Sequence, residues 1–132
     1  MRIVLDTNVL VAAAYNPRSA SRRIVDACLE GTLTAVASEA VRREYQFILA
    51  RAVRVPDYQE QLAALVDGLQ IVRPGQTPRV VADDPDDDKI LAAAMAGGAQ
   101  WIVTSDRHLL ALDPYCGIRI APAGQLVKIL PA

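Results

Sequence analysis

Residues 2–13 read RIVLDTNVLVAA, and residues 83–110 read DDPDDDKILAAAMAGGAQWIVTSDRHLL. Each stretch contains a short apolar run, RIVL at 2–5 and WIVT at 101–104, with an aspartate one or two residues after it. Continuous apolar runs of this length are typical of strands that are buried on both faces of a parallel sheet. We therefore expect two buried strands with acids at their carboxyl ends.

Helical and strand patterns alternate along the rest of the chain. Further short strands are expected at residues 33–37, 70–73 and 118–120, with a loop at 74–78. Helices are expected at residues 8–14, 19–30, 38–52, 56–69, 86–96, 107–112 and 122–129. This alternation predicts an α/β domain whose parallel sheet is covered on both faces. Ligands of such sheets bind outside the carboxyl ends of the strands, so the polar residues there are the first candidates for function.

Composition sets broad limits on the fold and its partners. The 132 residues fit one domain, residues 1–132, and 52% of them are hydrophobic, which is enough for an aliphatic core. The net charge is −1, but five aspartates lie between residues 83 and 88, which leaves ten acids against fourteen Lys and Arg elsewhere. That excess of +4 is a weak argument for a nucleic-acid partner. No apolar run approaches the ~18 residues of a membrane span, so we expect a soluble, cytoplasmic protein.

Asp6 and Asp106 each follow one of the two buried runs. Carboxyl ends of strands are where this fold class places its chemistry, which favours a functional role. The alternative is that each aspartate caps the helix that comes next, as Asp often does. Position alone leaves both roles open.

Glu44 lies in the central stretch SEAVRREYQFIL at residues 38–49. The apolar stripe of this expected helix comprises Val41, Tyr45, Ile48 and Leu49. Glu44 falls on the border of that stripe, where a carboxylate is costly unless it is paired or binds a cation. A salt bridge with Arg43 or Arg51 is the alternative to a functional role.

The acidic run places one aspartate on an apolar helical face. The expected inward face of helix 86–96 comprises Ile90, Leu91, Ala94 and Met95. Asp87 precedes the first two of these by three and four residues, so it lies in the middle of that face, whereas Lys89 points away. The other members of the run are expected to be capping or solvated groups, with Asp88 close enough to assist from the edge: Asp83, Asp84, Asp86 and Asp88.

Four acids gathered at one sheet edge predict a cation site. Oxygen donors favour Mg²⁺ or Mn²⁺ over Zn²⁺, and the two cysteines lack zinc spacing. Such ions are the usual apparatus for phosphodiester hydrolysis. Another Mg²⁺-dependent phosphohydrolase is an alternative, but the sequence DTN at residues 6–8 lacks the second acid that such enzymes place after the first strand.

The three quoted stretches together resemble the PIN-domain nucleases, in that family's order and spacing, and are most similar to toxins of bacterial type II toxin–antitoxin systems. The resemblance implies a Rossmann-like α/β/α sandwich with a parallel sheet of about four to five strands, and Mg²⁺- or Mn²⁺-dependent endoribonuclease activity. It places the family's catalytic, metal-binding acids at Asp6, Glu44, Asp87 and Asp106. It also implies that nearby polar side chains orient ligands or water, namely Thr7, Asn8, Thr104 and Ser105.

His108, the only histidine, departs from the family pattern. Relatives often have an aspartate at this position, so a second metal is left open. A surface role is the simple interpretation, and contact with phosphate or proton transfer are the alternatives.

The resemblance also implies three partners: an RNA substrate, a cognate antitoxin protein and a second copy of the chain in a homodimer, with no membrane. Arginines near the motifs are candidates for RNA binding, with solubility as the alternative: Arg18, Arg22, Arg51 and Arg107. A non-catalytic PIN-like module that binds RNA or protein is the remaining alternative, and the presence of all four acids disfavours it.

Overall fold

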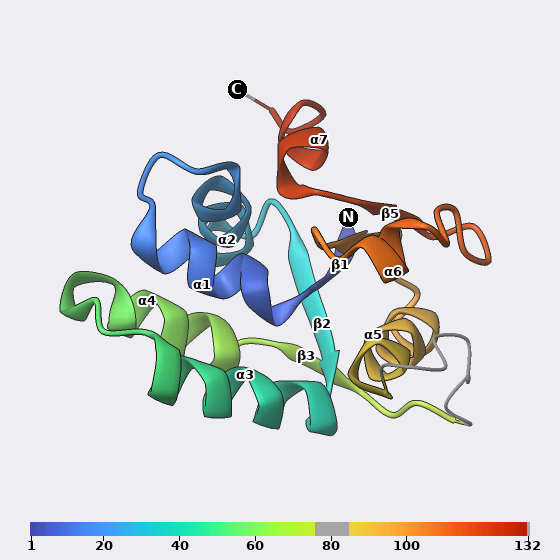
Figure 1. The fold of residues 1–132 in the computed structure, drawn as a ribbon, viewed down its shortest axis with the longest axis horizontal. Coiled ribbons are helices and arrows are strands. Elements are labelled where there is room, and N and C mark those ends of the chain that lie inside the picture. Colours follow the sequence, from blue (N-terminus) through green and yellow to red (C-terminus); the bar gives the residue numbers. More distant parts are fainter. Residues whose placement is uncertain (76–84, 132) are drawn as a thin grey trace.

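Five parallel strands form the sheet, in the order β3-β2-β1-β4-β5 (Figure 1). This is seen in a computed structural model that describes residues 1–75 and 85–131, with the backbone alone at residues 85 and 86. The strands are β1 (Arg2–Leu5), β2 (Thr34–Ser38), β3 (Gln70–Val72), β4 (Trp101–Val103) and β5 (Arg119–Ala121). All four pairings are parallel, which confirms the predicted sheet.

Helices cover both faces of this sheet. They are α1 (Thr7–Tyr15), α2 (Ala20–Glu30), α3 (Glu39–Ala52), α4 (Pro56–Asp67), α5 (Pro85–Ala96), α6 (Arg107–Leu110) and α7 (Ala123–Val127). Helices α1 to α4 lie on one side and α5 and α6 on the other, while α7 packs against α2 (Figure 1). Right-handed crossovers explain the two layers, because the chain steps from β1 to β2 to β3 in one direction and returns to β4 and β5 in the other. The α/β/α sandwich is thereby confirmed.

Local signals in the sequence set several helix ends. The hydroxyl of Ser19 accepts a hydrogen bond from the Arg22 N–H (3.1 Å), and the hydroxyl of Ser38 accepts one from the Val41 N–H (3.2 Å). Gly31 ends α2 with a φ of 87°, a left-handed conformation that other residues rarely adopt. These caps were predicted from Ser and Gly at the expected positions.

Some boundaries differ from the prediction by one or two residues. Strands β2 and β5 each begin and end one residue later than expected. Pairing with β1 and β3 sets the ends of β2, and pairing with β4 sets those of β5. Helix α4 ends at Asp67 rather than at residue 69. The Gly68 N–H donates to the Ala64 carbonyl (2.9 Å) and closes the last turn. Helix α7 is shorter than the expected 122–129. Of the expected loop at 74–78, residues 76–78 lie outside the described residues.

The core is aliphatic, as the composition predicted. Ile3, Val4 and Leu5 of β1 have no exposed surface. Helix α5 is buried on most of its circumference because its central positions are small alanines, Ala92–Ala94. The expectation that Met95 faces inward was wrong, since this side chain is 48% exposed. Among the described residues, no helix is long and apolar enough to cross a membrane.

Candidate metal centre

The carboxyl ends of β1 and β4 lie side by side at the centre of the sheet. The chain leaves β1 toward β2 on one side, and reaches β5 from β4 on the other, so this is the point where the strand order reverses. In sheets of this kind the ligand crevice opens at such a point. Asp6 follows β1 here, and Thr104 and Asp106 follow β4.

Asp6 does not use its side chain to cap α1. Its backbone is extended, as an N-cap requires, but its carboxylate makes no capping hydrogen bond. Instead, its Oδ2 accepts a hydrogen bond of 2.6 Å from the hydroxyl of Thr104. The capping alternative is therefore wrong for Asp6, and its carboxylate instead contacts the segment that follows β4.

Asp106 combines both of the roles that its position suggested. Its Oδ1 accepts the His108 N–H (2.8 Å), which caps the short helix α6. Its own N–H donates to the Thr104 hydroxyl oxygen (3.0 Å). Since the single hydroxyl proton of Thr104 goes to Asp6, this buried threonine joins the two acidic segments in one fixed orientation.

Asp87 reaches the same place from helix α5. It lies in the first turn of α5 and is 6% exposed. One ligand atom each from Asp87, Asp106 and His108 lies within 4.8 Å of the others. The positive end of the α5 dipole also favours a carboxylate in the first turn. Two segments distant in sequence, the first turn of α5 and the start of α6, thus supply one group of metal-type donors.

Glu44 is half-buried on α3, at the border that the stripe predicted. The next residue, Tyr45, is 1% exposed, and its hydroxyl donates to the carbonyl of Leu5, directly before Asp6. Burial raises the pKa of the Tyr45 phenol, and the negative charges of Asp6 and Glu44 raise it further. Both carboxylates therefore lie in the neighbourhood of one phenol. The sequence prediction treated Tyr45 only as core and missed this anchor, although a buried tyrosine usually needs a partner for its O–H.

The remaining aspartates of the acidic run differ from the prediction in one respect. Asp88 was expected at the solvated surface, but it is as buried as Asp87, at 6% exposure. Its position in the first turn of α5 leaves it at the side of the cluster, and its charge acts on the phenol of Tyr115. Lys89 is exposed as predicted. The side chains of Asp83, Asp84 and Asp86 lie outside the described part of the chain.

Comparison with known proteins agrees with this geometry. The family model described as PIN domain matches residues 2–108. The chain belongs to the PIN-domain family.

Two solved structures share this PIN fold. A crystal structure of VapBC2 from Rickettsia felis, bound to a DNA fragment from their promoter, has a TM-score of 0.60 and 17% identity, and the match covers 91% of this chain and 97% of that one. PAE2754 from Pyrobaculum aerophilum has a TM-score of 0.56 and 20% identity, with 97% of each chain covered. A search of curated proteins found no match.

The residues at the crevice of this PIN domain suit a small divalent cation. Asp87 and Asp106 offer carboxylate oxygens, and His108 offers a ring nitrogen. The Thr104 hydroxyl donates to the Asp6 carboxylate and accepts the Asp106 N–H, which orients both acidic residues. Within the described residues the compact group contains these three side chains. Asp6 joins it through Thr104, and Glu44 lies on the α3 side, next to Tyr45.

The other polar residues predicted near the site divide by burial. Thr7 is 8% exposed and Thr104 is 1% exposed, so both are held within the fold. Asn8 and Ser105 are exposed beside Asp6 and Asp106 in the chain. Of these four residues, Thr104 is the one whose hydrogen bonds link the acids.

The four candidate arginines are not equivalent. The guanidinium of Arg22 donates to the carbonyls of Ala13 (2.7 Å) and Ala14 (3.4 Å) and lies over the ring of Tyr58, so it already has partners within the chain. Arg51 is in the last turn of α3, and its guanidinium lies over the ring of Phe47. Arg18 follows α1, whose opposite end carries Asp6. Exposed Arg107 is adjacent to Asp106 and is the best-placed candidate.

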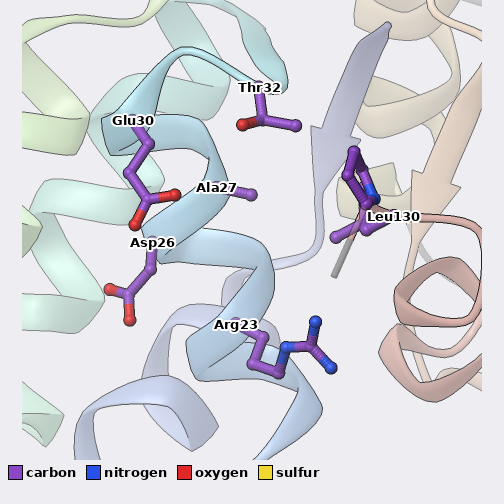
Figure 2. A pocket seen from close by; sticks show the side chains of 7 residues that line it. Arg23, Asp26, Ala27, Glu30, Thr32 and Leu130 are labelled. Atoms are coloured by element: carbon purple, nitrogen blue, oxygen red, sulfur yellow. The ribbon is translucent and has the colours of Figure 1, made fainter.

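A separate hollow of about 310 Å³ lies between α2 and the segment after α7 (Figure 2). Its lining comprises Arg23, Asp26, Ala27, Glu30, Thr32, Leu130 and Pro131. Thr32 precedes β2, so this hollow belongs to the amino edge of the sheet, and none of the four predicted acids lines it. It is therefore distinct from the candidate metal centre.

Proposed function

We propose that this PIN domain is an endoribonuclease that depends on Mg²⁺ or Mn²⁺ and uses Asp6, Glu44, Asp87 and Asp106. The observation that supports the proposal is the compact group of Asp87, Asp106 and His108, with Asp6 tied to the Asp106 segment at the reversal point of the sheet. Thr104 bridges Asp6 to the backbone of Asp106, and Asp87 approaches Asp106 from the first turn of α5. Such convergence of carboxylates is costly unless a cation binds among them.

A divalent ion held by these acids would polarise the scissile phosphate and lower the pKa of an attacking water. The chain's own residues position and orient the acidic side chains. Thr104 holds one oxygen of Asp6 by a 2.6 Å hydrogen bond, and the Tyr45 anchor holds the end of β1 against α3. Exposed Arg107 is placed to contact a backbone phosphate of single-stranded or loop RNA.

We also propose that the protein is the toxin of a toxin–antitoxin pair and acts as a homodimer. The PIN family and the similarity in fold to the Rickettsia felis VapBC2 structure support this assignment. An antitoxin could block the site by inserting a basic group among the carboxylates. Much of the apolar faces of α2 and α4 is buried within the chain, so packing of the core accounts for these faces.

Cleavage of a mixed RNA pool tests the catalytic proposal. Purified wild-type protein should cut RNA with Mg²⁺ or Mn²⁺ and lose this activity in EDTA, and Asp6→Ala should be inactive in both. Metal-independent cleavage, or an Asp6→Ala variant as active as wild type, would contradict the mechanism.

Expression in a bacterial host tests the toxin assignment separately. Induction of the wild-type chain should arrest growth, and Asp6→Ala at equal protein level should not. Unchanged growth with a protein that cleaves RNA in vitro would contradict the toxin role and leave the nuclease intact.

A further inference from the structure

We propose that His108 is a metal ligand of this centre and that its ring nitrogen makes the site prefer Mn²⁺ over Mg²⁺. The inference rests on the proposed function only in that the acids must bind a divalent cation. It assigns a role to the side chain that distinguishes this site from an all-carboxylate cluster.

The geometry brings the imidazole within reach of the acids. A ligand atom of His108 lies within 4.8 Å of those of Asp87 and Asp106, and Nδ1 is 3.8 Å from Oδ1 of Asp106. Two donors on one ion, each ~2.1–2.2 Å from it, can be up to ~4.3 Å apart. A side-chain movement of less than ~1 Å therefore converts the observed group into a ligand set.

The backbone holds His108 while its ring can adjust. The His108 N–H donates to Asp106 (2.8 Å), which fixes the residue at the start of α6. Its side chain is 65% exposed, so packing does not lock the ring in one rotamer. Asp87, in contrast, is buried and comes from α5, so the imidazole closes the group from the solvent side.

The donor types indicate which ion the group prefers. Mg²⁺ takes hard oxygen ligands in near-ideal octahedral geometry and gives up water reluctantly. Imidazole suits transition metals, while a carboxylate majority keeps the site suitable for Mn²⁺. Replacing one carboxylate by one imidazole should therefore weaken Mg²⁺ binding more than Mn²⁺ binding.

A simple surface role would explain the same histidine without a metal. A protonated ring 3.8 Å from Asp106 forms an exposed ion pair, which contributes little to stability. The two explanations differ in whether the ring nitrogen bonds to an added ion, and this can be measured directly.

Electron paramagnetic resonance of Mn²⁺ bound to the tag-free protein, without RNA, provides the test. His108 is the only histidine, so electron spin echo modulation from an imidazole ¹⁴N can come from this residue alone. Wild type should show the modulation and His108→Asn should not. We expect His108→Asn to weaken Mn²⁺ binding at least about tenfold and Mg²⁺ binding less than about twofold. His108→Asp should strengthen Mg²⁺ relative to Mn²⁺.

The absence of ¹⁴N modulation in wild type, or equal loss of both metals in His108→Asn, would overturn the assignment. The variant Asp87→Asn separates this outcome from a failure of the proposed function. If Asp87→Asn binds Mn²⁺ as wild type does, the acid cluster is not the metal centre and both proposals fall. If it loses Mn²⁺ while His108→Asn does not, only the role of His108 is wrong.

Discussion

Asp6 and Asp106 stand after neighbouring strands, but they serve the fold differently. Asp106 caps α6, whereas Asp6 makes no capping hydrogen bond. Asp106→Ala should therefore lower the free energy of unfolding by about 1 kcal/mol through the lost cap. Asp6→Ala should lower it by about 1–3 kcal/mol, because the buried Thr104 hydroxyl loses its acceptor. Both should reduce RNA cleavage about 100-fold or more, because loss of metal-based charge stabilisation is worth several kcal/mol. Urea unfolding and single-turnover cleavage measure the two effects; wild-type stability in either variant would contradict the hydrogen bond assigned to that residue.

We predict that Thr104 contributes to stability and metal binding through its hydroxyl group rather than through its shape. Thr104→Val keeps the shape but leaves the Asp106 N–H and the Asp6 carboxylate without their shared partner. It should cost about 1–3 kcal/mol of stability and weaken metal binding, whereas Thr104→Ser should retain most of both. Urea unfolding and metal titration of the three proteins check this, and a Val variant that matches Ser would show that the bridge is unimportant.

At the residue scale, the sequence identified candidate site residues more readily than the hydrogen bonds between them. Helical spacing predicted Asp87 on the inward face of α5, and this side chain is buried. Burial of Asp88 was not predicted, because small alanines let nearly the whole circumference of α5 be enclosed. The Thr104–Asp6 and Tyr45–Leu5 hydrogen bonds join residues 98 and 40 positions apart, and no local pattern specifies such pairs.

Helix α5 is held against β2 at a point where only glycine fits. A Cβ added at Gly97 would lie 2.8 Å from Cγ2 of Val36 and 3.0 Å from the Ala93 carbonyl. Gly97→Ala should therefore destabilise the protein by about 1–3 kcal/mol through overpacking. Because α5 carries Asp87, the shift should also weaken metal binding.

A double-mutant cycle tests this close contact. Val36→Ala removes the nearest side-chain atoms, so Val36→Ala/Gly97→Ala should be less destabilised than the sum of the single variants by about 0.5 kcal/mol or more. Urea unfolding of the four proteins gives the coupling energy between the two substitutions. Strict additivity would mean that Val36 does not limit the approach of α5.

At the element scale, caps were predictable and ladder ends were not. Ser19, Gly31 and Ser38 act within a few residues of themselves, so the sequence locates the ends that they set. The ends of β2 and β5 depend on the register of a neighbouring strand, which is distant in sequence.

The whole molecule should lose stability at alkaline pH. Burial raises the pKa of the Cys28 thiol to about 12, and it also raises the pKa of the Tyr45 and Tyr58 phenols. A group whose pKa is raised by folding contributes its stability below the unfolded pKa and loses it as pH rises toward the folded one. For Cys28 this loss of stability occurs between about pH 9 and about pH 12. Within that range the free energy of unfolding should fall by about 1.4 kcal/mol per pH unit.

Cys28→Ala isolates the thiol in this pH dependence. Under reducing conditions, the free energy of unfolding of wild type should fall more steeply between pH 9 and 10.5 than that of the variant. Equal slopes in urea unfolding at these pH values would show that Cys28 does not titrate on unfolding.

At the scale of the molecule, alternation of elements predicted the α/β/α class but not the strand order. The order brings β1 beside β4, which are about a hundred residues apart, and so decides that Asp6 meets the segment of Asp106. The sequence placed acids at strand ends, and topology determined which ends meet.

The account depends most on four carboxylates acting as one metal-dependent centre for RNA cleavage. The direct measurement is the Mn²⁺-dependent cleavage rate of a mixed RNA pool by Asp6→Asn, Glu44→Gln, Asp87→Asn and Asp106→Asn. Asp67→Asn is the control, since this exposed acid precedes β3 at the amino edge of the sheet. We predict that each of the four loses about 100-fold or more while the control matches wild type. Wild-type activity in any of the four, or cleavage that persists in EDTA, would contradict the account.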